Sequence, residues 1–175
     1  MRLENRSVIV TGAGRGLGRA ISLDMAREGA RLTMLSRTLK ELDRVADQIK
    51  SEGGACQTVE ADVSDPGAVQ KAVNACLDRF KGIDVLVNNA GVIGPSRFLE
   101  DADAATWDRT LGINLSGAFY FAKEVVPVMI EKGKGKIINI SSGLGQMAFP
   151  RFCAYGVSKA GIIQLTRSLA EELKG

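Results

Sequence analysis

The stretch SVIVTGAGRGLG, residues 7–18, decides the fold. It begins with a short run of β-branched residues, which is typical of a strand covered on both faces. It then turns through glycines into the amphipathic pattern LGRAISLDMAREG, residues 17–29, which stops at Gly29, a C-cap residue. A strand, a glycine-rich turn and a helix in this order predict the first unit of a nucleotide-binding sheet.

The rest of the chain repeats this alternation of strand and helix. Further strands are expected at residues 30–36, 55–63, 83–91 and 135–142, and further helices at 39–54, 65–82, 105–132 and 154–174. Strands that alternate with helices are parallel and joined by helical crossovers. We therefore expect residues 1–175 to form one α/β domain, a Rossmann-type doubly wound parallel sheet in a three-layer αβα arrangement.

Composition excludes several classes of protein. The chain has 175 residues, 45% of them hydrophobic, with mixed charges that sum to +3 and only 5% aromatic residues. Such weak, mixed charge and few stacking residues argue against a nucleic-acid partner. The N-terminus has no apolar signal region, and no run of about 18 apolar residues occurs. We expect a cytoplasmic protein that does not bind membranes.

The cysteine pattern does not predict a disulfide framework. The chain has three, Cys56, Cys76 and Cys153, at wide spacings and without a CxxC pair. An odd number at such spacings is typical of reduced intracellular thiols rather than of disulfides or a zinc site. We therefore expect no metal site.

The glycine-rich turn TGAGRGLG carries the first functional prediction. Glycines allow a tight turn and a close approach to a pyrophosphate, and the following helix offers free N–H groups and a favourable dipole. We expect Gly12, Gly16, Leu17 and Gly18 to bind a dinucleotide. The alternative is a plain glycine-rich loop, which the flanking strand and helix make the weaker interpretation.

The ends of the next two strands predict which dinucleotide binds. The second strand ends in Ser36 and Arg37, where an acid would bind the ribose 2′-hydroxyl of NAD. Arg37 and Arg15 could instead clamp a 2′-phosphate, so we expect NADP(H) to be preferred over NAD(H). Asp62 and Val63, at the end of the third strand, are expected to contact adenine. The alternatives are that Arg37 is a solvated surface charge and Asp62 a turn or capping residue.

A polar constellation follows the fifth strand. Ser142 ends that strand at the carboxyl edge of the sheet, the edge that also carries the glycine turn. Tyr155 and Lys159 are four residues apart on one face of the next helix. A YxxxK spacing alone usually reflects a helical tyrosine and a surface lysine. Together with Ser142 and the nucleotide turn, it predicts a catalytic site.

The chemistry of these groups suits hydride transfer. Reduction of a carbonyl requires a proton for the developing alkoxide, and a free tyrosine phenol, with a pKa of about 10, is a poor base in the reverse direction. An ammonium group such as that of Lys159 stabilises the phenolate of Tyr155. Ser142 can hydrogen-bond the substrate oxygen. Tyrosine tuned by lysine thus takes the role that histidine often fills, and this chain has no histidine.

A further candidate lies within the long predicted helix. Asn114 is a polar residue in an otherwise apolar stretch and therefore needs a hydrogen-bond partner. It could hold a water that links Lys159 to solvent, or it could kink the helix for structural reasons. The residues leave both possibilities open.

Taken together, these motifs carry a resemblance. TGxxxGxG at Thr11–Gly18, NNAG at Asn88–Gly91, Asn114, Ser142 and YxxxK at Tyr155–Lys159 occur in the order and spacing of the short-chain dehydrogenase/reductase family. The chain resembles this family over essentially its whole length.

The resemblance implies roles for these residues. Asn114, Ser142, Tyr155 and Lys159 would form the catalytic tetrad, with Asn114 keeping a main-chain kink and a proton-relay water. Tyr155 and Lys159 would also contact the cofactor, Lys159 through the nicotinamide ribose. The NNAG segment would steady the sheet and abut the cofactor, so Asn89 is expected to bind it, and Ala90 and Gly91 to line the adenine-ribose side.

The resemblance also implies a substrate class and partners. The chain is similar to 3-oxoacyl-(acyl-carrier-protein) reductases, so the substrate is expected to be a small carbonyl compound or alcohol, including carrier-linked ones. Met147, Phe149 and Phe152, in the loop after the fifth strand, suggest an apolar substrate part. Apolar residues on more than one face of the last two helices predict a homodimer or homotetramer.

Other readings are weaker. An extended-branch sugar-nucleotide epimerase would carry TGxxGxxG at the turn, which this chain lacks. Members of the resembled family usually continue past the equivalent of Gly175 into further strands and a substrate lid, so the fold would lack its last strands. We therefore expect a longer parent protein to be active and this chain alone to be weakly active or inactive. The alternative is a non-catalytic dinucleotide-binding fragment.

Overall fold

The computed structural model describes residues 1–174 and confirms the parallel α/β architecture. The strands are β1 (Ser7–Thr11), β2 (Arg31–Ser36), β3 (Ala55–Glu60), β4 (Val85–Asn88) and β5 (Lys136–Asn139). The α-helices are α1 (Gly16–Arg27), α2 (Leu39–Ser51), α3 (Pro66–Phe80), α4 (Ala104–Leu111), α5 (Gly117–Glu131) and α6 (Cys153–Glu172). The strand order is β3-β2-β1-β4-β5, with every pairing parallel.

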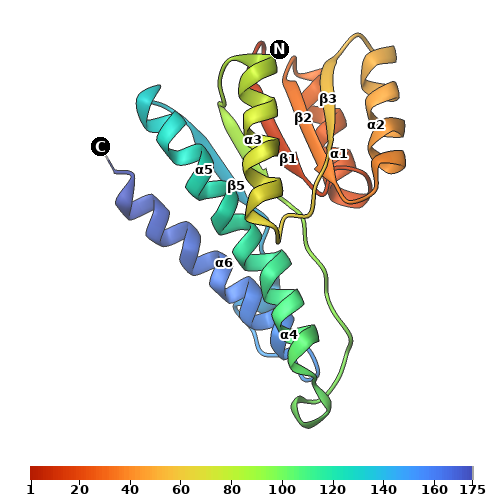
Figure 1. The fold of residues 1–175 in the computed structure, drawn as a ribbon. Helices are drawn as coiled ribbons and strands as arrows, with labels where there is room; N and C mark the ends of the chain where they lie inside the picture. The colour runs from red at the N-terminus through yellow and green to blue at the C-terminus, as the bar shows by residue number, and fades with distance from the viewer. Residues whose placement is uncertain (175) are drawn as a thin grey trace.

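Helices cover both faces of the sheet, as Figure 1 shows, and its central strands β1, β2 and β4 are the buried ones. All five residues of β1 are buried because their side chains alternate between the layers. Ile9 packs in a cluster with residues of α3 and α5, whereas Val8 and Val10 pack in a second cluster with residues of α1 and α2. From β1 the chain continues to β2 and β3 on one side of the sheet, and β4 and β5 lie on the other side. The switch point is therefore between β1 and β4, where ligands bind in such sheets.

The long helical stretch expected at residues 105–132 is interrupted. A π-helix, η2 (Gly112–Ser116), joins α4 to α5. At Gly117 a Cβ would lie 2.9 Å from the carbonyl oxygen of Val63, so the helix passes very close to the chain that follows β3. A π-turn inserts one extra residue and often marks a functional site. Here it turns Asn114 inward, where its side chain is buried.

Three strand ends are wrong in the sequence prediction, since β4, which was expected to run to Gly91, ends at Asn88. β3 ends at Glu60, so Asp62 and Val63 follow the strand, and β5 ends at Asn139, three residues before Ser142. The reason lies in the neighbouring strands, since Glu60 pairs with the last residue of β2 and Asn139 with the last residue of β4. Beyond those partners no ladder continues.

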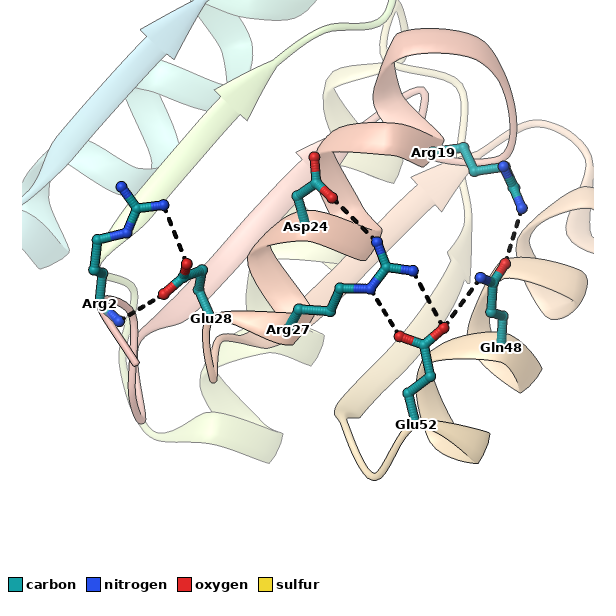
Figure 2. A network of polar contacts seen from close by, with 7 residues as sticks. All are labelled: Arg2, Arg19, Asp24, Arg27, Glu28, Gln48 and Glu52. Atoms are coloured by element: carbon teal, nitrogen blue, oxygen red, sulfur yellow. Dashed lines mark hydrogen bonds and ion pairs between the residues drawn. The ribbon is translucent and has the colours of Figure 1, made fainter.

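Side-chain contacts hold α1 and α2 together on one face (Figure 2). Arg27 of α1 donates to Glu52, just after α2, through Nε at 2.9 Å and Nη2 at 3.3 Å. Arg19 Nη2 donates to Gln48 Oε1 at 2.8 Å. Exposed pairs of this kind contribute about 0–1 kcal/mol each, so they fix the angle between the helices more than they stabilise the fold.

Helix starts and ends follow local chemistry. Asp65 caps α3 by accepting a hydrogen bond from Gly67 N at 2.8 Å, with Pro66 in the first turn, as expected. Gly29 follows α1 with a φ of +88°. Within residues 1–174 no helix has both the length and the apolar character that crossing a bilayer requires.

Candidate active site

The glycine turn between β1 and α1 has a conformation that its sequence explains. Gly12 and Gly16 have φ angles of +64° and +53°, in the left-handed region that favours glycine. A Cβ on Gly18 would lie only 2.2 Å from the carbonyl oxygen of Gly12. Arg15 occupies the N-cap of α1 without a side-chain capping bond. The first backbone N–H groups of α1 therefore have no side-chain partner from the cap and are available to an anion.

A cleft of about 370 Å³ opens over this turn. It brings together the cofactor-binding residues predicted from the first four strand ends: Gly12, Arg15, Gly16, Leu17, Gly18, Ser36, Arg37, Asp62, Val63, Asn89, Ala90 and Gly91. Tyr155 and Lys159 do not line it. Sequence reasoning missed five lining residues, Gly14, Thr38, Glu41, Val92 and Ile113. Of these, only Gly14 carried a signal, because it lies inside the glycine motif.

The cleft offers backbone donors of the kind that bind a dinucleotide. At Gly16 a Cβ would have no neighbour within 4 Å, so this part of the turn faces open space. Unpaired helix N–H groups and a glycine backbone at the mouth of a cleft are the features that hold a pyrophosphate. Gly12, Arg15 and Gly16 would flank that group.

Charges of both signs meet at the adenosine end of the cleft. Arg37 Nη1 lies 3.8 Å from Asp62 Oδ2. Asp62 Oδ1 also accepts hydrogen bonds from Ser64 N at 2.9 Å and Ser64 Oγ at 2.6 Å. Burial opposes ionisation of Asp62, but the Ser64 hydrogen bonds and the charge of Arg37 outweigh it and lower its pKa. Asp62 is therefore an anion that partly neutralises Arg37.

A second acid in this region was not expected. A Cβ on Gly14 would lie 2.9 Å from Cβ and 3.2 Å from Oε2 of Glu41, which stands in the first turn of α2. Its carboxylate thus borders the same space as Ser36 and Arg37. The sequence prediction considered only the strand end and overlooked the first turn of the following helix.

The NNAG segment holds the glycine turn in place. Asn89 Nδ2 donates to the carbonyl oxygens of Thr11 at 2.9 Å and Gly12 at 3.2 Å. The backbone N–H groups of Asn89 and Ala90 both donate to Thr11 Oγ1 at 2.9 Å. The side chain of Asn89 therefore positions the turn, a role beyond the predicted cofactor contact.

Gly91 lies nearer the predicted catalytic residues than expected. A Cβ on Gly91 would be 3.3 Å from Asn114 Oδ1 and 3.6 Å from Lys159 Nζ. Gly91 also lines the cofactor cleft, so it lies between the cleft and these residues. A Cβ here would therefore press on Asn114 Oδ1 and touch Lys159 Nζ at ordinary contact distance.

Lys159 is buried, with 5% of its surface exposed. Its Nζ donates to the carbonyl oxygen of Ile140 at 2.7 Å and lies 5.8 Å from the centroid of the Tyr155 ring. Burial lowers the pKa of Lys159. The structure therefore brings the ammonium of Lys159 close to the ring of Tyr155 on α6.

Asn114 connects three parts of the site. Its Oδ1 accepts from Val92 N at 2.8 Å, and its Nδ2 donates to Val92 O at 2.8 Å and to Ser158 Oγ at 3.0 Å. Ser158 Oγ in turn donates to the Tyr155 carbonyl at 2.7 Å. Both N–H groups of the amide are thus donated to protein atoms. The side chain itself ties the loop after β4 to α6, which supports the structural interpretation of this residue.

Ser142 stands in the loop that packs on α6. Its Oγ accepts from Leu144 N at 3.3 Å, and it caps a short 3₁₀ turn, η3 (Gly143–Gly145). A Cβ on Gly145 would lie 2.8 Å from the backbone oxygen of Lys159, so the turn sits directly on the helix. Ser141 Oγ donates to that same oxygen at 3.1 Å. These contacts hold the Ser142 segment beside the Tyr155–Lys159 turn of α6.

A doubly wound sheet with a glycine turn and a cleft at its switch point defines the class of dinucleotide-binding α/β proteins. Residues 6–175 match the family model described as short chain dehydrogenase. Oxidoreductase UcpA of Salmonella typhimurium is 40% identical over 172 residues, which cover 98% of this chain and 65% of UcpA. The chain belongs to the short chain dehydrogenase family.

Solved structures agree closely with this fold. NAD+-bound xylitol dehydrogenase matches with a TM-score of 0.95 and 33% identity, covering 99% of this chain and 66% of its own. A metagenomic short-chain oxidoreductase in complex with NADP matches with a TM-score of 0.96 and 34% identity, covering 99% and 79%. This chain thus spans about 65% of the length of UcpA and similar relatives.

Proposed function

We propose that the protein is an NADP(H)-dependent oxidoreductase that transfers a hydride between the nicotinamide and a carbonyl compound or secondary alcohol. The observation that carries this proposal is the buried ammonium of Lys159 beside the ring of Tyr155. The pKa of Lys159 is lowered by burial alone. Among residues 1–174 no ion pair between Lys159 and an acid is found. An uncompensated buried charge is retained at a stability cost, which favours a catalytic role.

The residues of the chain divide the chemistry between them. In the reducing direction Tyr155 donates its phenolic proton to the carbonyl oxygen, and Lys159 stabilises the phenolate that remains. Ser142 hydrogen-bonds the same oxygen and keeps it near the phenol. When bound, the nicotinamide supplies or accepts the hydride. Asn114 positions α6 through Ser158 and so holds the phenol in place.

Preference for NADP(H) is supported by Arg15 and Arg37, which both line the cleft. A 2′-phosphate could displace Asp62 from Arg37, because the existing pair is long and exposed. Glu41 and Asp62 oppose this preference by like-charge repulsion, and the two structural neighbours were solved with different cofactors. Because these charges oppose one another, comparing the affinities for NADPH and NADH is the most direct test of the NADP(H) assignment.

The substrate class and the assembly belong to the same proposal. The neighbour named xylitol dehydrogenase supports an alcohol or the corresponding carbonyl as the reacting group. Carrier-linked 3-oxoacyl groups fall within this class. Self-association as a dimer or tetramer is supported by apolar side chains exposed on α5 and α6, namely Phe119, Ile130 and Val157.

Titration of the chain with NADPH and NADH tests the proposal. Replacing Arg37 by Met removes one charged contact worth about 1.5–3 kcal/mol, which weakens NADPH binding by about 10- to 100-fold and leaves NADH binding unchanged. Arg44→Met is the matched control, since Arg44 is an exposed arginine of α2 outside the cleft. Equal effects of Arg37→Met on both cofactors would overturn the NADP(H) assignment.

The catalytic assignment is tested separately. Tyr155→Phe removes only the phenolic oxygen, so cofactor affinity stays within a factor of two or so while carbonyl reduction falls by about 10²–10⁴-fold. Full reduction activity in Tyr155→Phe would show that another group supplies the proton.

A further inference from the structure

A second cavity, of about 40 Å³, lies next to Tyr155 and is distinct from the cofactor cleft. It is bordered by the loop after β4, by α4 and by the start of α6. Arg97, Trp107, Arg151 and Tyr155 are among its lining residues. Under the proposed function Tyr155 marks the reacting end of the substrate. A cavity of this size has room for only a few atoms, so it would take one end group of the substrate next to the reacting carbon.

The two arginines are brought together by the fold. Arg97 N donates to the carbonyl oxygen of Arg151 at 3.1 Å, which ties the loop after β4 to the loop before α6. Arg151 has a φ of +71°, in the left-handed region that a non-glycine residue rarely adopts. Its guanidinium lies 4.6 Å from the centroid of the Phe98 ring. Stacking on an aromatic face orients the guanidinium without neutralising its charge.

The positive charge at this cavity is only partly compensated, because the charge of Arg97 contributes, after the Thr106 hydrogen bonds, to the lowered pKa of Asp103. Within residues 1–174 neither Arg97 nor Arg151 forms an ion pair with an acid. Asp103 is the acid among the lining residues. Its carboxylate is already engaged as the cap of α4, accepting from Thr106 N and Thr106 Oγ1, each at 2.7 Å. Two exposed arginines thus line the cavity together with one carboxylate, which is held at the cap of α4.

The apolar pocket expected from the sequence is only partly present. Phe152 lines the cavity, but Met147 and Phe149 do not, and their side chains are 63% and 61% exposed. Met147 and Phe149 are directed toward solvent, and Arg151, which follows them in the same loop, lines the cavity. Charge rather than apolar surface distinguishes this cavity.

We propose that the substrate carries an anionic group, which Arg97 and Arg151 bind while its carbonyl or hydroxyl group reacts at Tyr155. This inference rests on the proposed function. Guanidinium groups match the arrangement of oxygens in a carboxylate, sulfonate or phosphate. A lysine ammonium is a point charge and does not match it in this way. The class is a small oxo or hydroxy acid with a short chain between the reacting carbon and the anion.

The chain contains a built-in probe for this site. Trp107 is its one tryptophan, and it lines the cavity. Its emission can be followed while 4-oxopentanoate or the methyl ester of that acid is added, with NADP+ or NAD+ present at a saturating level. The acid and the ester share the ketone and differ in charge. We expect the acid to change the emission with at least tenfold higher affinity than the ester.

Arginine variants assign the effect to these side chains. Arg97→Met and Arg151→Met are each expected to weaken acid binding at least tenfold and to leave ester binding unchanged. Arg167→Met, an exposed arginine of α6 outside the cavity, is the matched control and retains the preference. Because Arg151 has an unusual backbone conformation, its variant could fold poorly, and Arg97→Met then decides the question.

The outcomes separate this inference from the proposed function. If the cofactor binds but acid and ester bind equally, the anionic substrate class is wrong and the oxidoreductase assignment stands. If the acid is preferred through Arg97 and Arg151 but neither cofactor binds, the anion site stands and the oxidoreductase assignment fails. Retained acid preference in Arg97→Met would also overturn the inference.

Discussion

Gly18→Ala tests whether close backbone approach imposes the glycine turn. The added Cβ would lie 2.2 Å from the carbonyl oxygen of Gly12 and 2.5 Å from Asn89 Nδ2. Favourable contacts lie near 3.5–4.0 Å, so the overlap exceeds about 1 Å, and a backbone oxygen cannot rotate away. Overpacking costs about 1–3 kcal/mol, and we take the upper end. Alanine returns up to about 1 kcal/mol of helix propensity, which leaves a net destabilisation of about 2 kcal/mol.

The assay is thermal unfolding together with NADPH titration. For a chain of this size each kcal/mol lowers Tm by about 2–4 °C, so Gly18→Ala should unfold about 4–8 °C earlier. NADPH binding should also weaken, because the shift separates the turn from the start of α1. Gly143→Ala is the matched control, since a Cβ there has no neighbour within 4 Å. Unchanged Tm and NADPH affinity in Gly18→Ala would refute the reasoning.

Two other predictions concern buried charges. Asp84 accepts hydrogen bonds from Lys132 Nζ at 2.6 Å, Ser7 N at 2.9 Å and Arg6 Nη1 at 3.1 Å. Burial opposes its ionisation, but these bonds outweigh burial and lower the pKa of Asp84. Its stabilisation is therefore present above the unfolded pKa of about 3.9 and is lost as pH falls through the lower folded pKa. In urea unfolding we expect Asp84→Asn to cost about 1.5–3 kcal/mol at pH 7 and less below pH 4 or so; an equal cost at both would contradict this account. For Lys159, whose pKa burial lowers, stability rises with pH between the folded pKa and the unfolded value of about 10.4. Lys159→Met should remove that rise, match or exceed the parent chain in stability at pH 7 and lose carbonyl reduction by about 10²–10⁴-fold; a large loss of stability at pH 7 would show that the ammonium is structural.

Local sequence could predict the elements and most of the cofactor cleft. Hydrophobic periodicity and caps are local, so the βα units and the Asp65 cap were predictable. The cleft followed because parallel strands bring their carboxyl ends to one edge. Features set by distant partners were not predictable. A kink at Asn114 was among the possibilities that the sequence raised, but its form as a π-helix was not, and Glu41 enters the cleft through the packing of α2.

The arrangement of the two cavities explains why tyrosine and lysine occupy one turn of α6. Gly91 lines the cofactor cleft, and a Cβ on it would lie 3.6 Å from Lys159 Nζ. Tyr155 lines the second cavity instead. Residues four apart on a helix are separated by about one turn, roughly 5.4 Å, and share a face. Under the proposed function one turn of α6 spans from the cofactor side to the substrate side, and a proton held by Tyr155 and a charge held by Lys159 would act on one reacting centre. A shift of α6 relative to β4 would separate the two functions, and the Asn114–Ser158 hydrogen bond opposes such a shift.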